Sequence, residues 1–111
     1  MKVEVFYFDG CPSYDALLPR LRELMAEAGI DEQIELKAVE SVEAAERNRF
    51  LGSPTLRIDG HDVEPAARER TDFGLKCRLY ASADGVRGTV PDKYVVTALT
   101  RARDARDAPA A

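Results

Sequence analysis

The stretch FYFDGCPSYDALLPRL, residues 6–21, contains the change of periodicity that decides the fold. Its first residues complete an apolar run over 2–8, rich in β-branched and aromatic side chains, which is typical of a buried strand. Asp9-Gly10 is a turn signal. From Leu17 onward, apolar residues recur at helical spacing and predict one apolar stripe of a helix. Cys11 therefore lies where a predicted strand gives way to a predicted helix.

The rest of the chain predicts an α/β fold with a mixed sheet. Gly29 is expected to end the first helix. A strand, a helix and a second strand this close together imply a parallel crossover, and Asp59-Gly60 predicts a tight antiparallel hairpin. The expected later elements are strands over 34–39, 55–58 and 61–63, a short helix over 41–49 and a last helix from Pro91. We therefore expect a sheet of four or five strands flanked by helices.

Length and composition predict one independent domain. The chain has 111 residues, of which 45% are apolar, so it is able to build a core without disulfide crosslinks. We expect a single domain over residues 1–106, with an insertion over about 64–90 and a flexible tail over 107–111.

Charge and hydropathy exclude several partners. The 16 Lys and Arg against 20 Asp and Glu give a net charge of −4, which argues against nucleic-acid binding. No apolar stretch approaches the roughly 20 residues of a membrane span, and the first residues lack the features of a signal peptide. We expect a cytoplasmic protein with no membrane partner, where two cysteines are more often reduced or catalytic than structurally crosslinked. With one histidine and no CxxC pair, no metal site and no cofactor are expected.

Cys11 is predicted to be a reactive thiol. A helix N-terminus has free N–H groups and positive potential, and both favour a thiolate. The thiolate is the form that attacks disulfides. Asp9 and Asp15 act in the opposite direction, because nearby negative charge disfavours the thiolate. The alternative is that Cys11 is a small buried apolar side chain.

Two prolines add to the pattern. Pro19, eight residues after Cys11, falls inside the helical stretch and is expected to kink it. Pro54 begins a buried strand and has no N–H to donate, which makes the Ser53-Pro54 bond a candidate for a cis peptide in a tight turn.

The joint order of these features resembles the thioredoxin superfamily. The resemblance covers roughly residues 1–63, and the last helix also fits. It implies a thioredoxin-like fold and a thiol–disulfide oxidoreductase with Cys11 as the nucleophile. It also implies a cis-proline at Pro54 whose neighbour Ser53 presents backbone groups to an extended thiol substrate. The segments FDGCPS, GSPT and GLKCRLY are similar to small bacterial thioredoxin-like proteins, some of which are named after organomercurial lyase.

The sequence also departs from the dithiol members of the superfamily. Tyr14 stands where their second cysteine would be, so no resolving thiol follows three residues after Cys11. Single-cysteine members work through glutathione or another small thiol. The implied substrate is a protein or small-molecule thiol or disulfide, and the implied substrate-binding residues include Pro12, Ser13 and Tyr14. Tyr14 either lines this site or packs against the body of the protein.

Two roles are open for Cys77. The predicted strand over 55–58 runs away from the end of the sheet that holds Cys11, and the strand over 61–63 runs back, so the insertion starts beside Cys11. Cys77 then either acts as the resolving thiol or is a packed thiol on a short strand. A disulfide needs Cα atoms within about 7 Å of each other.

Two further functions compete with the oxidoreductase. One is a non-catalytic thioredoxin-like binding module, in which the cis-proline edge holds an extended peptide through backbone hydrogen bonds. The other is a protein that holds an organomercurial or another soft electrophile between two thiolates.

Overall fold

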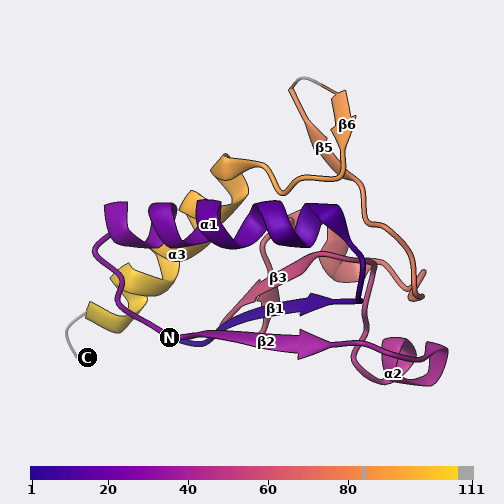
Figure 1. Ribbon diagram of the computed structural model, residues 1–111. Coiled ribbons are helices and arrows are strands. Elements are labelled where there is room, and N and C mark those ends of the chain that lie inside the picture. Colours follow the sequence, from indigo (N-terminus) through magenta and orange to yellow (C-terminus); the bar gives the residue numbers. More distant parts are fainter. Residues whose placement is uncertain (84, 108–111) are drawn as a thin grey trace.

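The computed structural model describes residues 1–83 and 85–107. Figure 1 labels its helices and strands. In chain order they are β1 (Val3–Tyr7), α1 (Pro12–Glu27), β2 (Ile34–Ala38), α2 (Val42–Arg47), β3 (Thr55–Ile58), β4 (His61–Asp62), the 3₁₀ helix η1 (Pro65–Glu69), β5 (Tyr80–Ser82), β6 (Gly85–Arg87) and α3 (Asp92–Asp107).

The predicted mixed sheet is confirmed, with four strands in the order β2-β1-β3-β4. β1 pairs in parallel with β2 and antiparallel with β3, and β3 pairs antiparallel with β4. The β3–β4 turn is the expected hairpin, since Asp59 and Gly60 have φ angles of 52° and 83°, as a two-residue type I′ turn requires. β5 and β6 form a separate hairpin that projects from the body of the molecule (Figure 1).

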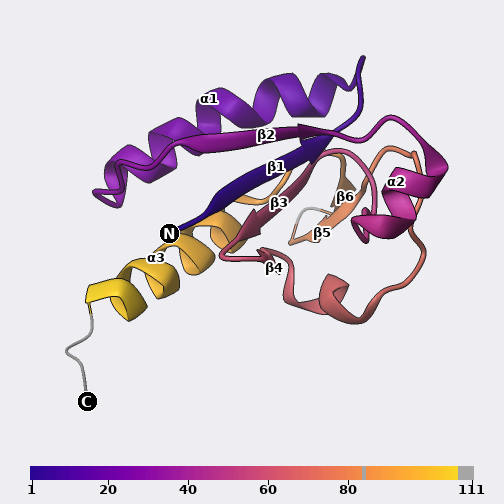
Figure 2. The ribbon, with the colours of Figure 1, turned by 90° about the horizontal axis from the view of Figure 1, so that it is seen from below.

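Helices lie on both faces of the sheet (Figures 1 and 2). α1 and α3 cover one face, where the larger apolar core collects Val3 and Val5 of β1. α2 covers one end of the other face, where Phe6 joins a smaller core with Val39, Ala45 and Phe50. Because side chains alternate along a strand, β1 contributes to both cores. This explains why its sequence is apolar with little alternation.

The first helix begins directly after Cys11, as predicted. Pro19 is accommodated within α1 without ending it. Gly29 follows the C-cap with φ of 72°, and the N–H groups of Gly29 and Ile30 bond back to the last turn of α1 at 3.1 and 2.9 Å. This hydrogen-bond pattern is a Schellman motif, which confirms Gly29 as the stop residue.

The predicted insertion contains more ordered structure than its sequence indicates. It holds η1, the β5–β6 hairpin and an isolated bridge between Ser53 and Cys77. α3 continues to Asp107, and the rest of the expected tail lies outside the described residues.

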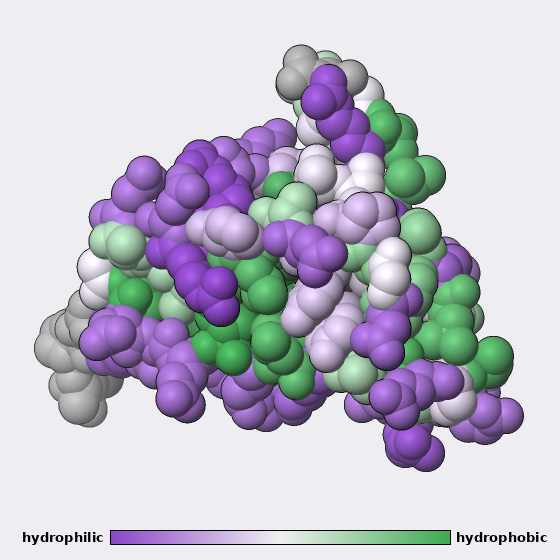
Figure 3. All heavy atoms as spheres, in the orientation of Figure 1, coloured by the Kyte–Doolittle hydropathy of each residue, from purple (hydrophilic) through white to green (hydrophobic). Residues whose placement is uncertain are grey.

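Surface hydropathy is uneven on the side shown in Figure 3. Hydrophilic residues cover the outer side of α1, and a more apolar strip lies between α1 and the edge strand β2. Within the described ranges, no helix combines the length and apolarity needed to cross a membrane.

Candidate functional site

Cys11 lies at the end of the loop between β1 and α1 and is the N-cap residue of α1. Cys11 is only 4% exposed. The thiol donates to the Ser53 carbonyl oxygen at 3.6 Å and makes no capping hydrogen bond to the helix. A thiolate has no proton to donate to this carbonyl. A Cys11 thiolate would therefore be more stable if its sulfur pointed toward the N–H groups of the first turn of α1.

The peptide bond between Ser53 and Pro54 is cis, as predicted. Ser53 is buried, and its hydroxyl oxygen accepts a hydrogen bond from the Phe8 N–H at 3.4 Å. The Thr55 hydroxyl donates to the Gly52 carbonyl oxygen at 2.7 Å. The first bond holds the loop before β3 against the residue that follows β1, and the second is internal to the loop.

Both backbone hydrogen-bonding groups of Ser53 are used within the chain. Its N–H donates to the Lys76 carbonyl oxygen at 2.8 Å, and its own carbonyl oxygen accepts from the Arg78 N–H at 3.0 Å. This pair of bonds forms the parallel bridge between Ser53 and Cys77. The chain's own residues 76–78 thus occupy the edge at which an extended substrate is expected to pair.

The Ser53 carbonyl oxygen links the two cysteine segments. It accepts from the Cys11 thiol at 3.6 Å and from the Arg78 N–H, the nitrogen bonded directly to Cys77, at 3.0 Å. Adjacent strands lie about 4.8 Å apart, so Cys77 is in the layer next to the residue that the Cys11 thiol contacts. Both cysteines are free thiols, with Cys11 buried and Cys77 exposed.

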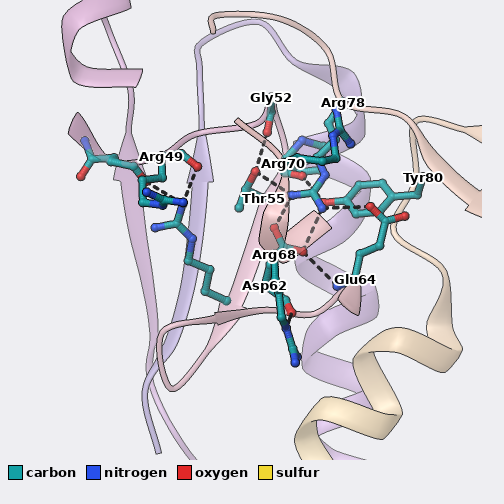
Figure 4. A network of polar contacts seen from close by, with 12 residues as sticks. Arg49, Gly52, Thr55, Asp62, Glu64, Arg68, Arg70, Arg78 and Tyr80 are labelled. Atoms are coloured by element: carbon teal, nitrogen blue, oxygen red, sulfur yellow. Dashed lines mark hydrogen bonds and ion pairs between the residues drawn. The ribbon is translucent and has the colours of Figure 1, made fainter. Parts of the chain in front are cut away.

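A buried arginine fixes the segment that contains Cys77 (Figure 4). The Arg78 guanidinium makes two hydrogen bonds to Asp62, at 2.6 and 2.8 Å, and further bonds to Glu64 at 3.2 Å and to Thr55 at 3.1 Å. It also stacks on the Tyr80 ring at 4.3 Å. Burial alone would lower the pKa of Arg78, but the hydrogen bonds and charge of Asp62, with Glu64, raise it. Arg78 is therefore held as a cation between two buried carboxylates.

Two further contacts fasten this segment to the cis-proline loop. The Tyr80 hydroxyl donates to the Pro54 carbonyl oxygen at 2.5 Å, and burial raises the pKa of Tyr80. Gly52 has φ of 126°, and a Cβ atom there would lie 2.9 Å from both the Arg78 Cβ and the Lys76 carbonyl oxygen. Residue 52 must therefore be glycine for residues 76–78 to approach this closely.

The first turn of α1 contributes less to this group of residues. Pro12 is exposed, and Ser13 lines a cavity of about 390 Å³ between α1 and residues 82–92. Tyr14 stacks on Tyr7 with ring centroids 4.0 Å apart. Burial, followed by the proximity of Tyr7, raises the pKa of Tyr14. The side-chain hydrogen bonds and strand bridge described above join Cys11, Ser53 and Cys77 and do not include Pro12 or Tyr14.

The residues that support the site are Asp62, Glu64, Arg78 and Tyr80, and the sequence patterns predicted no role there for the first three. Along residues 75–80 the usual hydropathy rule is reversed, since Leu75 and Leu79 are 41% and 60% exposed while Arg78 is 1% exposed. The signal in the sequence is the order of these residues in an extended segment, where successive side chains point to opposite sides. Arg78 and Tyr80 therefore share one side of the segment, and Cys77 and Leu79 share the other.

No group of three or more histidine, cysteine and carboxylate side chains is arranged to hold a metal ion among the described residues. Comparison of the chain with protein-family models, with curated protein sequences and with solved structures found no match. The resemblance to the thioredoxin superfamily therefore stays a prediction.

Proposed function

We propose that this protein is a thiol–disulfide oxidoreductase of the thioredoxin-like type in which Cys11 and Cys77 act as a pair. The observation that supports the pairing is the shared contact with Ser53. Its carbonyl oxygen accepts a hydrogen bond from the Cys11 thiol, while its backbone forms a parallel β-bridge with Cys77. Two free thiols whose residues both contact Ser53 suit an exchange reaction better than two unrelated packed cysteines.

The proposed cycle moves two electrons from the protein to a substrate disulfide. A thiolate of the pair attacks one sulfur of the substrate, which forms a mixed disulfide and releases the other substrate sulfur as a thiolate. The second cysteine, as its thiolate, then attacks the protein sulfur of the mixed disulfide. This step forms the Cys11–Cys77 disulfide and releases the second substrate sulfur. A dithiol or two equivalents of a monothiol, such as glutathione, restores the reduced protein.

The order of attack depends on two properties that the cysteines do not share. Cys11 lies at the positive end of a 16-residue helix, which favours it as the attacking thiolate. Cys77 is exposed, so it is the sulfur that a disulfide in solution reaches first in this structure. For Cys11 to attack first, its buried sulfur must become accessible to the substrate. Residues 76–78 pair with Ser53, the residue that the Cys11 thiol contacts, so displacement of this segment would free the Ser53 edge.

The occupied Ser53 edge also bears on the binding-module alternative. An extended peptide that pairs with Ser53 must first replace the hydrogen bonds to Lys76 and Arg78. The geometry therefore favours exchange within the chain over capture of a peptide at this edge.

Trapping with single-cysteine variants tests the proposal. Cys11→Ser and Cys77→Ser are incubated with hydroxyethyl disulfide, and intact mass and release of mercaptoethanol are followed, with the double serine variant as the control. We expect at least one single variant to accumulate a stable mixed disulfide that the wild-type protein resolves. The variant that forms it faster identifies the first nucleophile. If neither variant forms an adduct and the wild type consumes no disulfide, the exchange function is wrong and the binding module takes its place.

A further inference from the structure

A second site lies on the face of the sheet opposite to α1 and α3. It is a cavity of about 210 Å³ between the end of α2, the β3–β4 hairpin and the loop after η1. Four arginines line it, Arg49, Arg57, Arg68 and Arg70, and we call it the arginine pocket. This concentration of positive charge is unexpected in a chain whose net charge is −4.

Three of these arginines have no carboxylate partner. The Arg57 guanidinium donates to the carbonyl oxygens of Asn48 and Arg49 at 2.6 and 2.9 Å. Arg68 donates to the Asp62 carbonyl oxygen at 3.1 Å. In the described part of the chain, no carboxylate lies within ion-pair distance of Arg49, Arg57 or Arg68. None of these three groups is therefore in an ion pair. Asp62, which also lines the cavity, and Glu4 act on Arg57 only at longer range.

The acidic residues near the arginine pocket already form ion pairs with cations other than these three arginines. Both oxygens of Asp62 face Arg78, and Asp72 binds Arg70 at 2.6 and 2.9 Å and Lys76 at 2.8 Å. Burial lowers the pKa of Arg57. The negative charges of Asp62 and Glu4 raise it, and the positive charges of Arg78 and Arg49 lower it. An anion in the cavity would relieve this repulsion, since opposite charges favour each other's ionised forms.

The walls hold the arginines in fixed orientations. Arg57 stacks on Phe6 at 4.3 Å, and Arg49 lies over the Phe73 ring at 5.2 Å. A guanidinium held flat presents its remaining N–H groups in a rigid fork, which matches the oxygens of phosphate. The pocket thus combines unpaired charge, fixed donors and an aromatic wall within one concave surface.

We propose that the arginine pocket binds the phosphate group of a small molecule. A phosphate dianion has enough charge and enough acceptor oxygens to engage three arginines, whereas a carboxylate has one charge and two oxygens. The cavity is smaller than the roughly 300–1,000 Å³ that drug-sized ligands occupy, so the ligand is inorganic phosphate or a compact phosphomonoester. The proposal does not depend on the cysteine chemistry, because it rests on residues of the opposite face.

Titration of the full chain with inorganic phosphate, sulfate and phenyl phosphate tests the site. Backbone and arginine Nε–H resonances are followed by NMR at constant ionic strength, with chloride as the reference salt. We expect a saturable shift confined to the pocket residues. Tighter binding of phenyl phosphate than of inorganic phosphate would identify an organic phosphomonoester as the ligand, and equal binding would identify phosphate itself. Equal binding of sulfate would still support a site for doubly charged oxyanions.

Charge-matched variants separate the pocket from the general surface. Arg49→Gln and Arg68→Gln are compared with Arg22→Gln, which removes the same charge from the exposed side of α1. Each pocket variant should weaken phosphate binding about tenfold or more, because a hydrogen bond to a charged group is worth that much. Arg22→Gln should bind as the wild type does, and urea midpoints check that all three fold. Binding that is unsaturable, spread over the surface or equal in all variants would overturn the proposal.

Discussion

Replacement of Arg78 by methionine should be the most damaging single change to the segment that contains Cys77. Methionine is similar in length but has neither the charge nor the donors. The change would leave Asp62 and Glu64, which are 8% and 7% exposed, without their cation. Removal of one partner from a buried ion pair typically costs about 3–5 kcal/mol. A chain of this length has a total stability of about 5–15 kcal/mol, so the variant should fold with a small margin.

Arg20 offers a control with similar bonds and different burial. It binds Asp92 through two nitrogens at 2.7 and 3.1 Å, as Arg78 binds Asp62, but both partners are exposed. Arg20→Met should therefore have a much smaller effect, because solvent screens the pair. Urea unfolding of both variants gives the comparison. Thr55→Val serves if Arg78→Met does not fold. It removes the hydrogen bond from Arg78 and the one to the Gly52 carbonyl oxygen, with an expected loss of about 1–3 kcal/mol.

The second readout is the equilibrium between the reduced protein and the Cys11–Cys77 disulfide. Without its guanidinium, the Cys77 segment is held mainly by its backbone bridge to Ser53 and by Tyr80, so the disulfide should become less favourable relative to glutathione. Equal losses of stability in Arg78→Met and Arg20→Met, or an unchanged disulfide equilibrium in Arg78→Met, would refute the positioning role of Arg78.

Three further predictions concern the same region and the sheet. Gly52→Ala should cost about 1–3 kcal/mol through overpacking against Arg78, and amide exchange at residue 78 should accelerate. Because burial raises the pKa of Tyr80 above its unfolded value, the contribution of Tyr80 to stability should be constant below about pH 10 and fall by about 1.4 kcal/mol per unit above it. Tyr80→Phe should flatten this alkaline fall in urea midpoints. Burial raises the pKa of Glu4, but Lys37 and Lys2 lower it by more, so the folded pKa lies below the unfolded one. The contribution of Glu4 to stability is therefore present above the unfolded pKa and is lost as pH falls through the folded pKa, and Glu4→Gln should reduce this acid loss.

Local sequence signals predicted the elements around Cys11 well. The strand before Cys11, the helix after it, the stop at Gly29 and the Asp59-Gly60 hairpin each depend on residues close together in the chain. The cis bond before Pro54 was predicted for the same reason, since a proline at the start of a buried strand is a local feature. Such local predictions are correct where the tertiary contacts favour the same conformation as the local sequence.

The surroundings of Cys77 depend on contacts that no local pattern reports. Burial of Arg78 is possible only because Asp62 and Glu64, from another part of the chain, neutralise and hydrogen-bond its guanidinium. The residues 76–78 pair with Ser53 across more than twenty positions. Hydropathy alone predicts the reverse arrangement, with Leu79 inside and Arg78 outside.

The most direct test of the pairing of Cys11 with Cys77 is the redox state of the two thiols in the wild-type protein. The protein is equilibrated across a series of glutathione ratios, its free thiols are alkylated, and its intact mass is measured, with Cys77→Ser as the control. We expect a reversible species in the wild type that has lost two hydrogen atoms and takes up no alkylating agent, and we expect this species to be absent in Cys77→Ser. If the wild type takes up two alkyl groups at every ratio, Cys11 and Cys77 do not act as a pair and the proposed exchange cycle is wrong.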